Sequence, residues 1–252
     1  MPEIIRVAGI GFCYGVDRAI RLAEQAAATY GSVATLGPLI HNPAALAELQ
    51  PRIHAVASLD QVTGEAVLIR SHGAPPEVLA EAKRRGLLVI DATCPCVAHV
   101  QRLAWDATEQ GRQVVIFGDA AHPEVAGICG WAGSKAIVVA DAVSAAALPV
   151  FPRLTLLAQT TESAAEYEAV AAVLAEKTAD LRVERTLCPG TQQVQRATAL
   201  VADQVEAMIV IGGRQSANTA RLAQISGERQ IDVYRVETAA DLDCDIVRKY
   251  RR

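Results

Sequence analysis

The stretch LLVIDATCPCVAHVQRLA (residues 87–104) decides the fold, because it carries an apolar run into a cysteine and then into a helical pattern. Two further stretches have the same order, IRVAGIGFCYGVDRAIRLAEQ (5–25) and LRVERTLCPGTQQVQRATAL (181–200). Short apolar runs that alternate with longer helical patterns are typical of βαβ units and parallel sheets. We therefore predict three passages in which a strand ends at a cysteine and a helix follows.

The distance from each cysteine to a later polar residue is also repeated. A polar residue follows each cysteine by 28 positions, in the pairs Cys13–His41, Cys94–His122 and Cys188–Ser216. A glycine stands four residues before each of these polar residues. This register indicates a threefold internal repeat, in which every unit offers one thiol and one polar group to a shared centre.

Strands and helices alternate through the rest of the chain and predict an α/β fold built from three similar small units with parallel sheets. We expect the units at residues 10–92, 93–186 and 187–252, arranged in pseudo-threefold fashion around a central cluster. The internal repeat predicts one more strand, turn and helix in the third unit, and the sequence shows no such elements there. The third unit is therefore expected to be truncated. Residues 1–9 are predicted to form a strand that pairs with one of the sheets, the third included.

The composition of the 252 residues supports a layered core and excludes several classes of function. Hydrophobic residues make up 51% and aromatic residues only 4%, so small and branched side chains fill the core. A net charge of −4 without a basic stripe argues against nucleic-acid binding. Neither a signal peptide nor an apolar run of ~18 residues is visible. We expect a cytoplasmic protein without membrane contact, whose six cysteines are thiols or ligands.

Polar residues at the ends of predicted strands supply a candidate site, because ligands of open α/β sheets bind at the carboxyl ends of the strands. These candidates are Cys13, His41, His72, Cys94, His122, Thr160, Cys188 and Ser216. Helix starts follow several of them, and the free N–H groups of a helix N-terminus attract anions. Three imidazoles suit either a metal or an anion. Because thiolates are available for a metal, we favour anion binding by the histidines.

Three cysteines of the repeat are predicted to bind a metal: Cys13, Cys94 and Cys188. Soft thiolate ligands are compatible with zinc, Cu(I) or an iron–sulfur centre. The repeat pattern contains no fourth thiolate, which leaves one coordination position open for chemistry. Cys96, Cys129 and Cys244 are predicted to be small buried apolar residues. Because Cys96 stands close to Cys94, an alternate ligand is a second interpretation for Cys96.

Glu124 is predicted to donate a proton, because a carboxyl group at a dry strand end can have a raised pKa. The alternative is an ordinary glutamate in the first turn of a helix, where acidic residues are favoured in any case. His54 and His99 fall within a predicted strand and a predicted helix, and we interpret both as structural.

Several stretches together resemble the LytB family of 4-hydroxy-3-methylbut-2-enyl diphosphate reductases. They occur in the order of that family, cover nearly the whole chain up to about residue 240, and read GFCYGVDRAI, GPLIHN, SHGAP, DATCPCV, GDAAHPEVAG, QTTES, TLCPGTQ and SANTARL. The patterns FCxGVxRA, DATCP and HPEVxG are specific, and together they are far stronger than a single short motif.

The resemblance implies three α/β domains around a central [4Fe–4S] cluster. Cys13, Cys94 and Cys188 would hold three irons, and the fourth iron would face the substrate. The substrate-binding residues that the resemblance implies are His41, His72, His122, Ser216 and Asn218. Glu124 and Thr160 would lie on the proton path. The implied reaction removes the allylic hydroxyl and yields isopentenyl and dimethylallyl diphosphate, the last step of the methylerythritol phosphate route, with electrons from a ferredoxin or flavodoxin type partner.

The chain departs from the family pattern in the third unit. Pro-Gly-Thr follows Cys188, Ala217 replaces the second serine of a Ser-Ser-Asn pattern, and the family segment Gly-Ile/Val-Thr-Ala-Gly-Ala-Ser is not found. Two alternatives to the reductase therefore stand: a divergent paralogue that keeps the cluster but acts on another substrate, and a non-catalytic cluster-binding redox sensor. A zinc hydrolase with three cysteine ligands is a further alternative.

Overall fold

The structure is a computed structural model that describes residues 3–133 and 135–251. It divides into two compact units, a larger one of Tyr14–Ile40 and Leu49–Cys188 and a smaller one of Met1–Cys13, His41–Glu48 and Pro189–Arg252. Every strand pair among the described residues is parallel. The predicted α/β class with parallel sheets is therefore confirmed.

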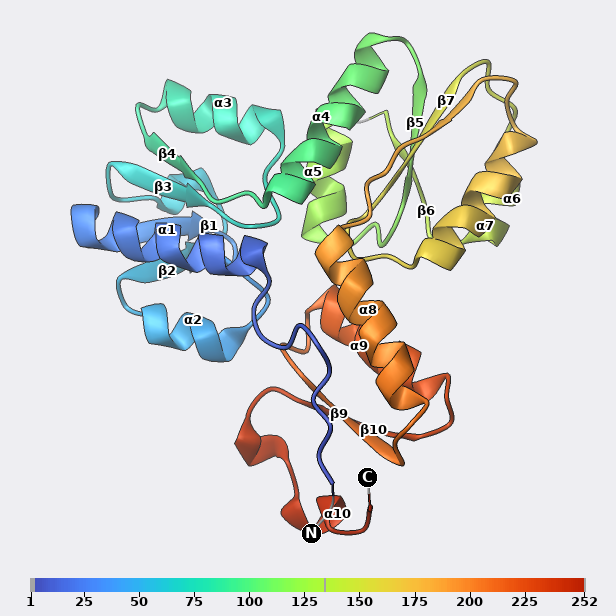
Figure 1. The fold of residues 1–252 in the computed structure, drawn as a ribbon. Helices are drawn as coiled ribbons and strands as arrows, with labels where there is room; N and C mark the ends of the chain where they lie inside the picture. Colours follow the sequence, from blue (N-terminus) through green and yellow to red (C-terminus); the bar gives the residue numbers. More distant parts are fainter. Residues whose placement is uncertain (1–2, 134, 252) are drawn as a thin grey trace. The chain divides into compact units, whose positions relative to one another are not determined.

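The larger unit contains two four-stranded sheets with the same strand order, β2-β1-β3-β4 and β6-β5-β7-β8 (Figure 1). The first sheet consists of β1 (Val33–Leu36), β2 (Ile53–Val56), β3 (Ala66–Ile69) and β4 (Leu88–Asp91). The second consists of β5 (Gln113–Phe117), β6 (Ile137–Val139), β7 (Leu154–Ala158) and β8 (Leu181–Val183). Two copies of one order show that the internal repeat extends to the topology.

Helices connect these strands, as parallel pairing requires. They are α1 (Tyr14–Tyr30), α2 (Pro43–Leu49), α3 (Pro76–Arg84), α4 (Pro95–Glu109), α5 (Pro123–Trp131), α6 (Ala142–Ala146) and α7 (Ala164–Ala175), with the 3-10 turn η1 (Leu59–Gln61). Among the described residues, five helices begin with proline, whose fixed φ suits the first helical position. In the described part of the chain, no helix is long and apolar enough to cross a bilayer.

Both faces of the second sheet are covered. Val115, Phe117 and Leu156 pack on one face against α6 and α7. Val114 and Ile116 point to the other face and pack against α4 and α5. Because both faces are buried, β7 consists entirely of buried residues, as expected for a central parallel strand. This packing gives a rigid platform for the residues at the carboxyl ends of the strands.

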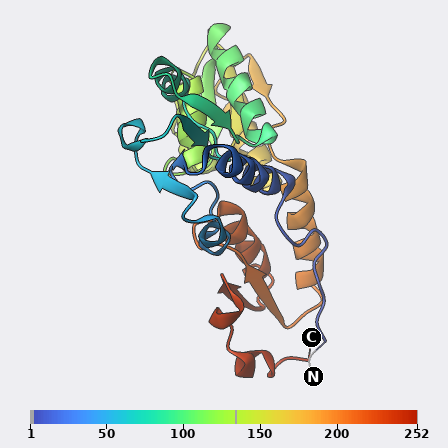
Figure 2. The ribbon, with the colours of Figure 1, turned by 90° about the vertical axis from the view of Figure 1, so that its left-hand side faces the viewer.

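The smaller unit contains a two-stranded sheet of order β10-β9, with β9 at Ala207–Ile211 and β10 at Asp232–Val236. Its remaining elements are α8 (Pro189–Ala202), α9 (Ala217–Gly227), the 3-10 turn η2 (Ala239–Asp241) and α10 (Cys244–Val247). Residues near the two chain ends lie side by side (Figure 2), since the N–H of Glu3 donates to the carbonyl of Arg251 at 2.8 Å.

One backbone hydrogen bond recurs in all three sheets. The glycine that follows the first strand donates its N–H to the valine that ends the second strand, in the pairs Gly37–Val56 (2.9 Å), Gly118–Val139 (3.0 Å) and Gly212–Val236 (2.9 Å). The glycines singled out by the sequence register therefore have one structural role. The repeat is local and threefold, whereas the pseudo-threefold arrangement and the boundaries of the three units stay predictions.

The predicted strand at residues 1–9 is wrong in its described part, because residues 3–10 form no strand. Gly9 has a φ of 84° and Gly11 a φ of 114°, and these left-handed values interrupt an extended chain. Val7 instead packs at the core of the smaller unit. The apolar run before Cys13 was therefore mistaken for a strand like those before the other two cysteines.

Gly118→Ala is expected to destabilise the protein by about 1–3 kcal/mol, as overpacked sites do. An added Cβ would lie 2.8 Å from the Cβ of Gln159, a buried atom close to the backbone that cannot move aside easily. Gly64→Ala is the control, because its nearest neighbour would be 3.8 Å away. Chemical denaturation measures both, and equal stability of the two variants would contradict the tight contact at Gly118.

Candidate functional site

The singled-out residues of the larger unit stand where strands end and helices begin. Cys94, His122 and Cys188 each precede the proline that starts α4, α5 or α8. The N–H of Cys94 donates to the carbonyl of Ser71, and the N–H of Cys188 donates to the carbonyl of Thr160, both at 2.9 Å. Cys94 is thus anchored to the polar turn that follows β3, and Cys188 is anchored to the polar turn that follows β7.

Three thiols lie together within the larger unit. The thiols of Cys188 and Cys94 are near enough to the thiol of Cys96 to act on its pKa. Burial, followed by the neighbouring sulfurs, raises the pKa of Cys96 to about 12. This proximity brings together two predicted ligands that are far apart in the sequence. Cys96, predicted to be a small buried apolar residue or an alternate ligand, is half-buried and lies near these two thiols.

Cys13 is exposed and is the residue before α1. Arg18 of α1 donates to the carbonyl oxygens of Thr93, at 3.0 Å, and Asp91, at 3.3 Å. The first turns of α1 are therefore tied to the backbone that leads directly into Cys94. Cys13 itself belongs to the smaller unit, and its role as a third ligand stays a prediction.

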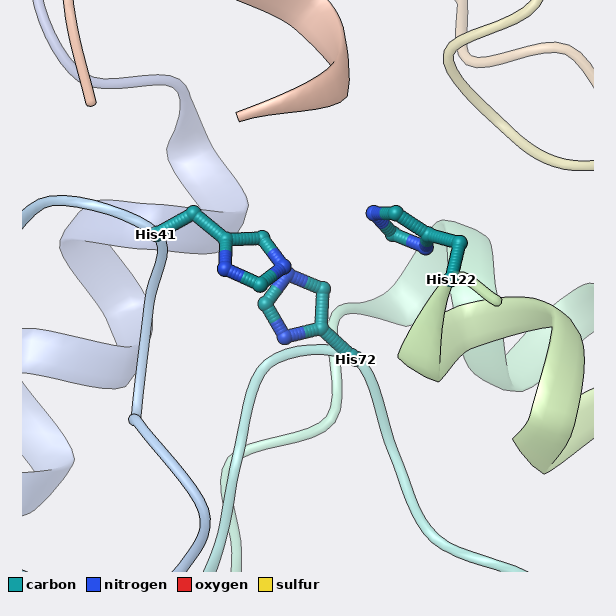
Figure 3. A group of neighbouring side chains, drawn as sticks. All are labelled: His41, His72 and His122. Carbon is teal, nitrogen blue, oxygen red and sulfur yellow. The ribbon is translucent and has the colours of Figure 1, made fainter. Parts of the chain in front are cut away.

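His72 and His122 form an edge-to-face pair in the larger unit, with ring centroids 5.5 Å apart and an interplanar angle of 85° (Figure 3). Nδ1 of His122 accepts a hydrogen bond from the N–H of Glu124 at 3.2 Å, which caps α5. Because Nδ1 is an acceptor, the neutral ring carries its proton on Nε2. His122 can therefore donate a hydrogen bond from Nε2.

His41 is the residue at which the chain passes from the larger unit into the smaller one. In the larger unit, the N–H and the Oγ of Ser71 both donate to the carbonyl of Leu39, at 3.1 and 3.0 Å. In the smaller unit, a Cβ added to Gly213 would lie 1.9 Å from the carbonyl oxygen of His41. Within the larger unit, the chain that leads to His41 is thus held at Leu39 beside Ser71, the residue before His72.

Glu124 and Thr160 form a buried hydrogen-bonded pair, with Glu124 only 2% exposed. The N–H of Thr160 donates to Oε1 at 2.7 Å and its hydroxyl donates to Oε2 at 3.1 Å. Burial raises the pKa of Glu124 to about 7, against the opposing effect of the two Thr160 hydrogen bonds, and the charge of Glu162 raises it further. A carboxyl group with this pKa can give up a proton near neutral pH.

Ser216 and Asn218 lie at the start of α9 in the smaller unit. The Oγ of Ser216 accepts a hydrogen bond from the N–H of Thr219 at 3.2 Å and caps the helix. Oδ1 of Asn218 is buried and has no hydrogen-bond partner among the described residues. Ordinary N-capping thus accounts for one role of Ser216, and ligand binding by both residues stays a prediction.

Gln101 lies beside the candidate site and is not among the residues predicted from the sequence. This side chain is 5% exposed, and its Nε2 has no hydrogen-bond partner in the described part of the chain. It fills the space in front of Gly73 and Gly127, where an added Cβ would lie 2.3 and 3.1 Å from Nε2. Gln101 thus supports the turn after His72. A glutamine on the apolar face of the predicted helix was the available signal.

The remaining predictions concern residues outside the candidate site. Cys129 is half-buried and packs against an apolar cluster, as predicted, whereas the side chain of Cys244 lies outside the described structure. His54 lies 3.3 Å from the Oγ of Ser32, and exposed His99 contacts Arg102 at 2.9 Å. Neither histidine belongs to the polar turns described above.

Comparison with known proteins gives a consistent result. The model of the LytB protein family matches residues 4–252. The 4-hydroxy-3-methylbut-2-enyl diphosphate reductase of Geobacter metallireducens is 39% identical over 242 residues, which cover 96% of this chain and 86% of that protein. The reductase of Geobacter sulfurreducens is 41% identical over 246 residues, with the same coverage.

Two solved structures are also similar. One is a 4-hydroxy-3-methylbut-2-enyl diphosphate reductase described as the terminal enzyme of the non-mevalonate pathway; it is 36% identical, with a TM-score of 0.70 over 100% of this chain and 92% of that one. The other is the diphosphate reductase from Plasmodium falciparum, 25% identical, with a TM-score of 0.89 over 96% of this chain and 78% of that one.

The burial of Glu124 predicts a pH-dependent stability. A glutamic acid in an unfolded chain titrates near ~4.3, whereas Glu124 in the folded chain titrates at about 7. The folded state therefore favours the protonated carboxyl. Its contribution to stability is complete below the unfolded pKa and is lost as the pH rises through the folded pKa. Glu124→Gln removes this titration, so the variant should gain up to about 3 kcal/mol relative to wild type between about pH 5 and pH 8.

Urea denaturation at several pH values measures this difference. Glu168→Gln, a substitution at an exposed glutamate, is the control and should follow the wild-type profile. If Glu124→Gln also runs parallel to wild type over this range, the carboxyl of Glu124 is not buried with a raised pKa.

Proposed function

Because the chain belongs to the LytB family, we propose that it reduces 4-hydroxy-3-methylbut-2-enyl diphosphate. The reaction takes up two electrons and two protons, breaks the allylic C–O bond, and releases water together with isopentenyl or dimethylallyl diphosphate. The observation that carries the proposal is the buried Glu124–Thr160 pair, since a reduction that expels a hydroxyl group needs a proton donor with a pKa near neutrality.

A [4Fe–4S] cluster is the proposed cofactor, held by Cys13, Cys94 and Cys188. The donor set fits this group, because two of the three sulfurs lie in one group of thiols and their backbones are anchored by hydrogen bonds to neighbouring turns. Thiolates are the usual ligands of such clusters. When bound, the cluster supplies electrons and an open, Lewis-acidic iron, neither of which a side chain can provide.

The diphosphate is proposed to bind to the histidines and to the start of α9. His41, His72 and His122 offer imidazole donors, and His122 presents its Nε2 proton because Nδ1 is engaged with α5. Ser216 and Asn218 add a hydroxyl and an amide at a helix N-terminus, where an anion is favoured. Fixing the diphosphate would hold the allylic carbon in one position relative to the proton donor.

Glu124 is proposed to protonate the departing hydroxyl group so that it leaves as water. Thr160 donates one hydrogen bond to each carboxyl oxygen of Glu124. These two bonds fix the orientation of the carboxyl group and therefore the direction of its acidic proton. Exclusion of water from this pair keeps the pKa of Glu124 raised and the proton available.

A ferredoxin or flavodoxin type protein is the proposed electron donor, and the cytoplasmic location stays a prediction of the sequence. The large coverage of relatives named as reductases supports oxidoreductase chemistry over a zinc hydrolase or a redox sensor. A paralogue with another substrate remains distinct from the main proposal, because it would bind the cluster and fail to reduce this diphosphate.

Glu124→Gln should lower turnover by about 10²–10⁴-fold, the typical contribution of a general acid, while iron and sulfide contents stay at the wild-type level. The assay uses anaerobic, dithionite-reduced protein and detects the two isoprenoid diphosphates. Glu168→Gln should keep full activity. Wild-type protein that contains the cluster but forms neither product would instead identify the paralogue.

Cys188→Ser should remove most of the bound iron, because oxygen is a poorer ligand than a thiolate for this cluster. Cys13→Ser and Cys94→Ser should behave in the same way, and Cys129→Ser should retain its iron. Iron and sulfide analysis with the visible absorption spectrum measures the effect. Iron retained at the wild-type level in the Cys188 variant would remove this cysteine from the ligand set.

A further inference from the structure

The segment of residues 72–75 lies along α5, and both belong to the larger unit. A Cβ added to Gly127 would lie 3.6 Å from the carbonyl oxygen of His72, and a Cβ added to Gly130 would lie 2.6 Å from the Cβ of Pro75. Residues three apart in sequence stand on one face of a helix. The two glycines therefore give α5 a bare face, against which the segment packs closely.

A side chain of α5 fixes this segment by a hydrogen bond. Nε1 of Trp131 donates to the carbonyl of Ala74 at 3.0 Å. Ala74 is buried, so water has little access to its carbonyl as an alternative donor. The N–H of Gly73 is engaged elsewhere, since it donates to the carbonyl of Arg70 at 3.0 Å. The indole thus ties the chain to α5 two residues after His72.

The other end of α5 carries two residues of the candidate site. His122 caps the helix, and Glu124 lies in its first turn. His72 on the segment and His122 at the helix start have ring centroids 5.5 Å apart (Figure 3). The nine residues of α5 form a stiff spacer of about 13 Å. A segment fixed to this helix by Trp131 is therefore held in a defined position relative to His122.

We propose that Trp131 is a positioning residue for diphosphate binding. Its N–H holds the carbonyl of Ala74 and thereby places His72 where its imidazole can meet the diphosphate. The indole acts through the segment and does not itself touch the substrate. The inference deepens the proposed function and rests on it, because His72 is one of the proposed diphosphate-binding residues. Since Glu124 lies at the other end of α5, the bond serves substrate binding and not proton transfer.

The chain offers a matched pair of variants, because it has two tryptophans and their rings touch. The rings of Trp105 and Trp131 are edge-to-face, with centroids 6.3 Å apart, and Trp105 is 46% exposed. Trp131→Phe removes the donor and keeps an aromatic ring. Trp105→Phe makes the same change in the ring partner, leaves the bond to Ala74 in place, and serves as the control.

A second variant removes the donor without changing the size of the ring. In the Trp105→Phe protein, Trp131 is the one remaining tryptophan. Expression with β-(3-benzothienyl)alanine in place of tryptophan then exchanges the N–H for a sulfur atom at this position alone. This benzothienyl variant separates the loss of the hydrogen bond from the effect of a cavity beside α5.

The measurements use anaerobically purified protein. Calorimetry without a reductant gives the Kd of 4-hydroxy-3-methylbut-2-enyl diphosphate, and assays with dithionite give kcat and KM. We expect both changes at Trp131 to raise Kd and KM about 3–10-fold, the size that one hydrogen bond accounts for. The kcat should stay within about twofold of wild type, since the proton donor is untouched. The Trp105→Phe control should match wild type in all three constants.

Four outcomes would contradict these expectations, and they can be told apart. An unchanged Kd in the benzothienyl variant would show that the N–H does not position His72. A fall in kcat as large as the rise in KM, or equal losses in the Trp105→Phe control, would show general damage to the fold and overturn the positioning role. Wild-type protein that neither binds nor reduces the diphosphate would overturn the proposed function together with this inference. Binding without reduction would overturn the proposed reaction alone.

Discussion

Parallel pairing of β5 with β7 is the constraint on which the candidate site depends. The register sets Phe117 opposite Ala158, and the N–H of Gln159 then donates to the carbonyl of Phe117 at 2.9 Å. Both strands therefore end at one edge of the sheet, where Glu124 meets Thr160. A slip of one residue would turn every side chain of a strand to the opposite face and separate this pair. The two apolar clusters on the faces of the sheet hold the register in place.

Proline at the first helical position converts each strand end into a defined site. It permits the helix to start directly after Cys94, His122 and Cys188, so the side chains of these residues stand at helix N-termini. Negative charge is stabilised there by the helix dipole and by free N–H groups. A proline at the first helical position would therefore favour the thiolates predicted at Cys94 and Cys188 and the anion binding predicted for His122.

Burial of polar groups near these ends is balanced by specific hydrogen bonds. An isolated buried carboxylate is costly, and the two bonds from Thr160 to Glu124 offset part of that cost without restoring an ordinary pKa. Burial, and then the neighbouring thiols of Cys188 and Cys94, raise the pKa of Cys96. Both groups of residues lie wholly within the larger unit. Glu124 is far from Thr160 in the sequence, and Cys96 is far from Cys188.

The sequence alone determined the α/β class, the parallel sheets and the repeated glycines, because periodicity and turn residues are local properties. It did not reveal that residues 3–10 lack a strand, since the left-handed φ values of Gly9 and Gly11 are not visible in an apolar run. Only the tertiary structure decided the contact of Cys96 with Cys188 and the bond of Glu124 to Thr160. These depend on the pairing of strands distant in sequence, which no local pattern specifies.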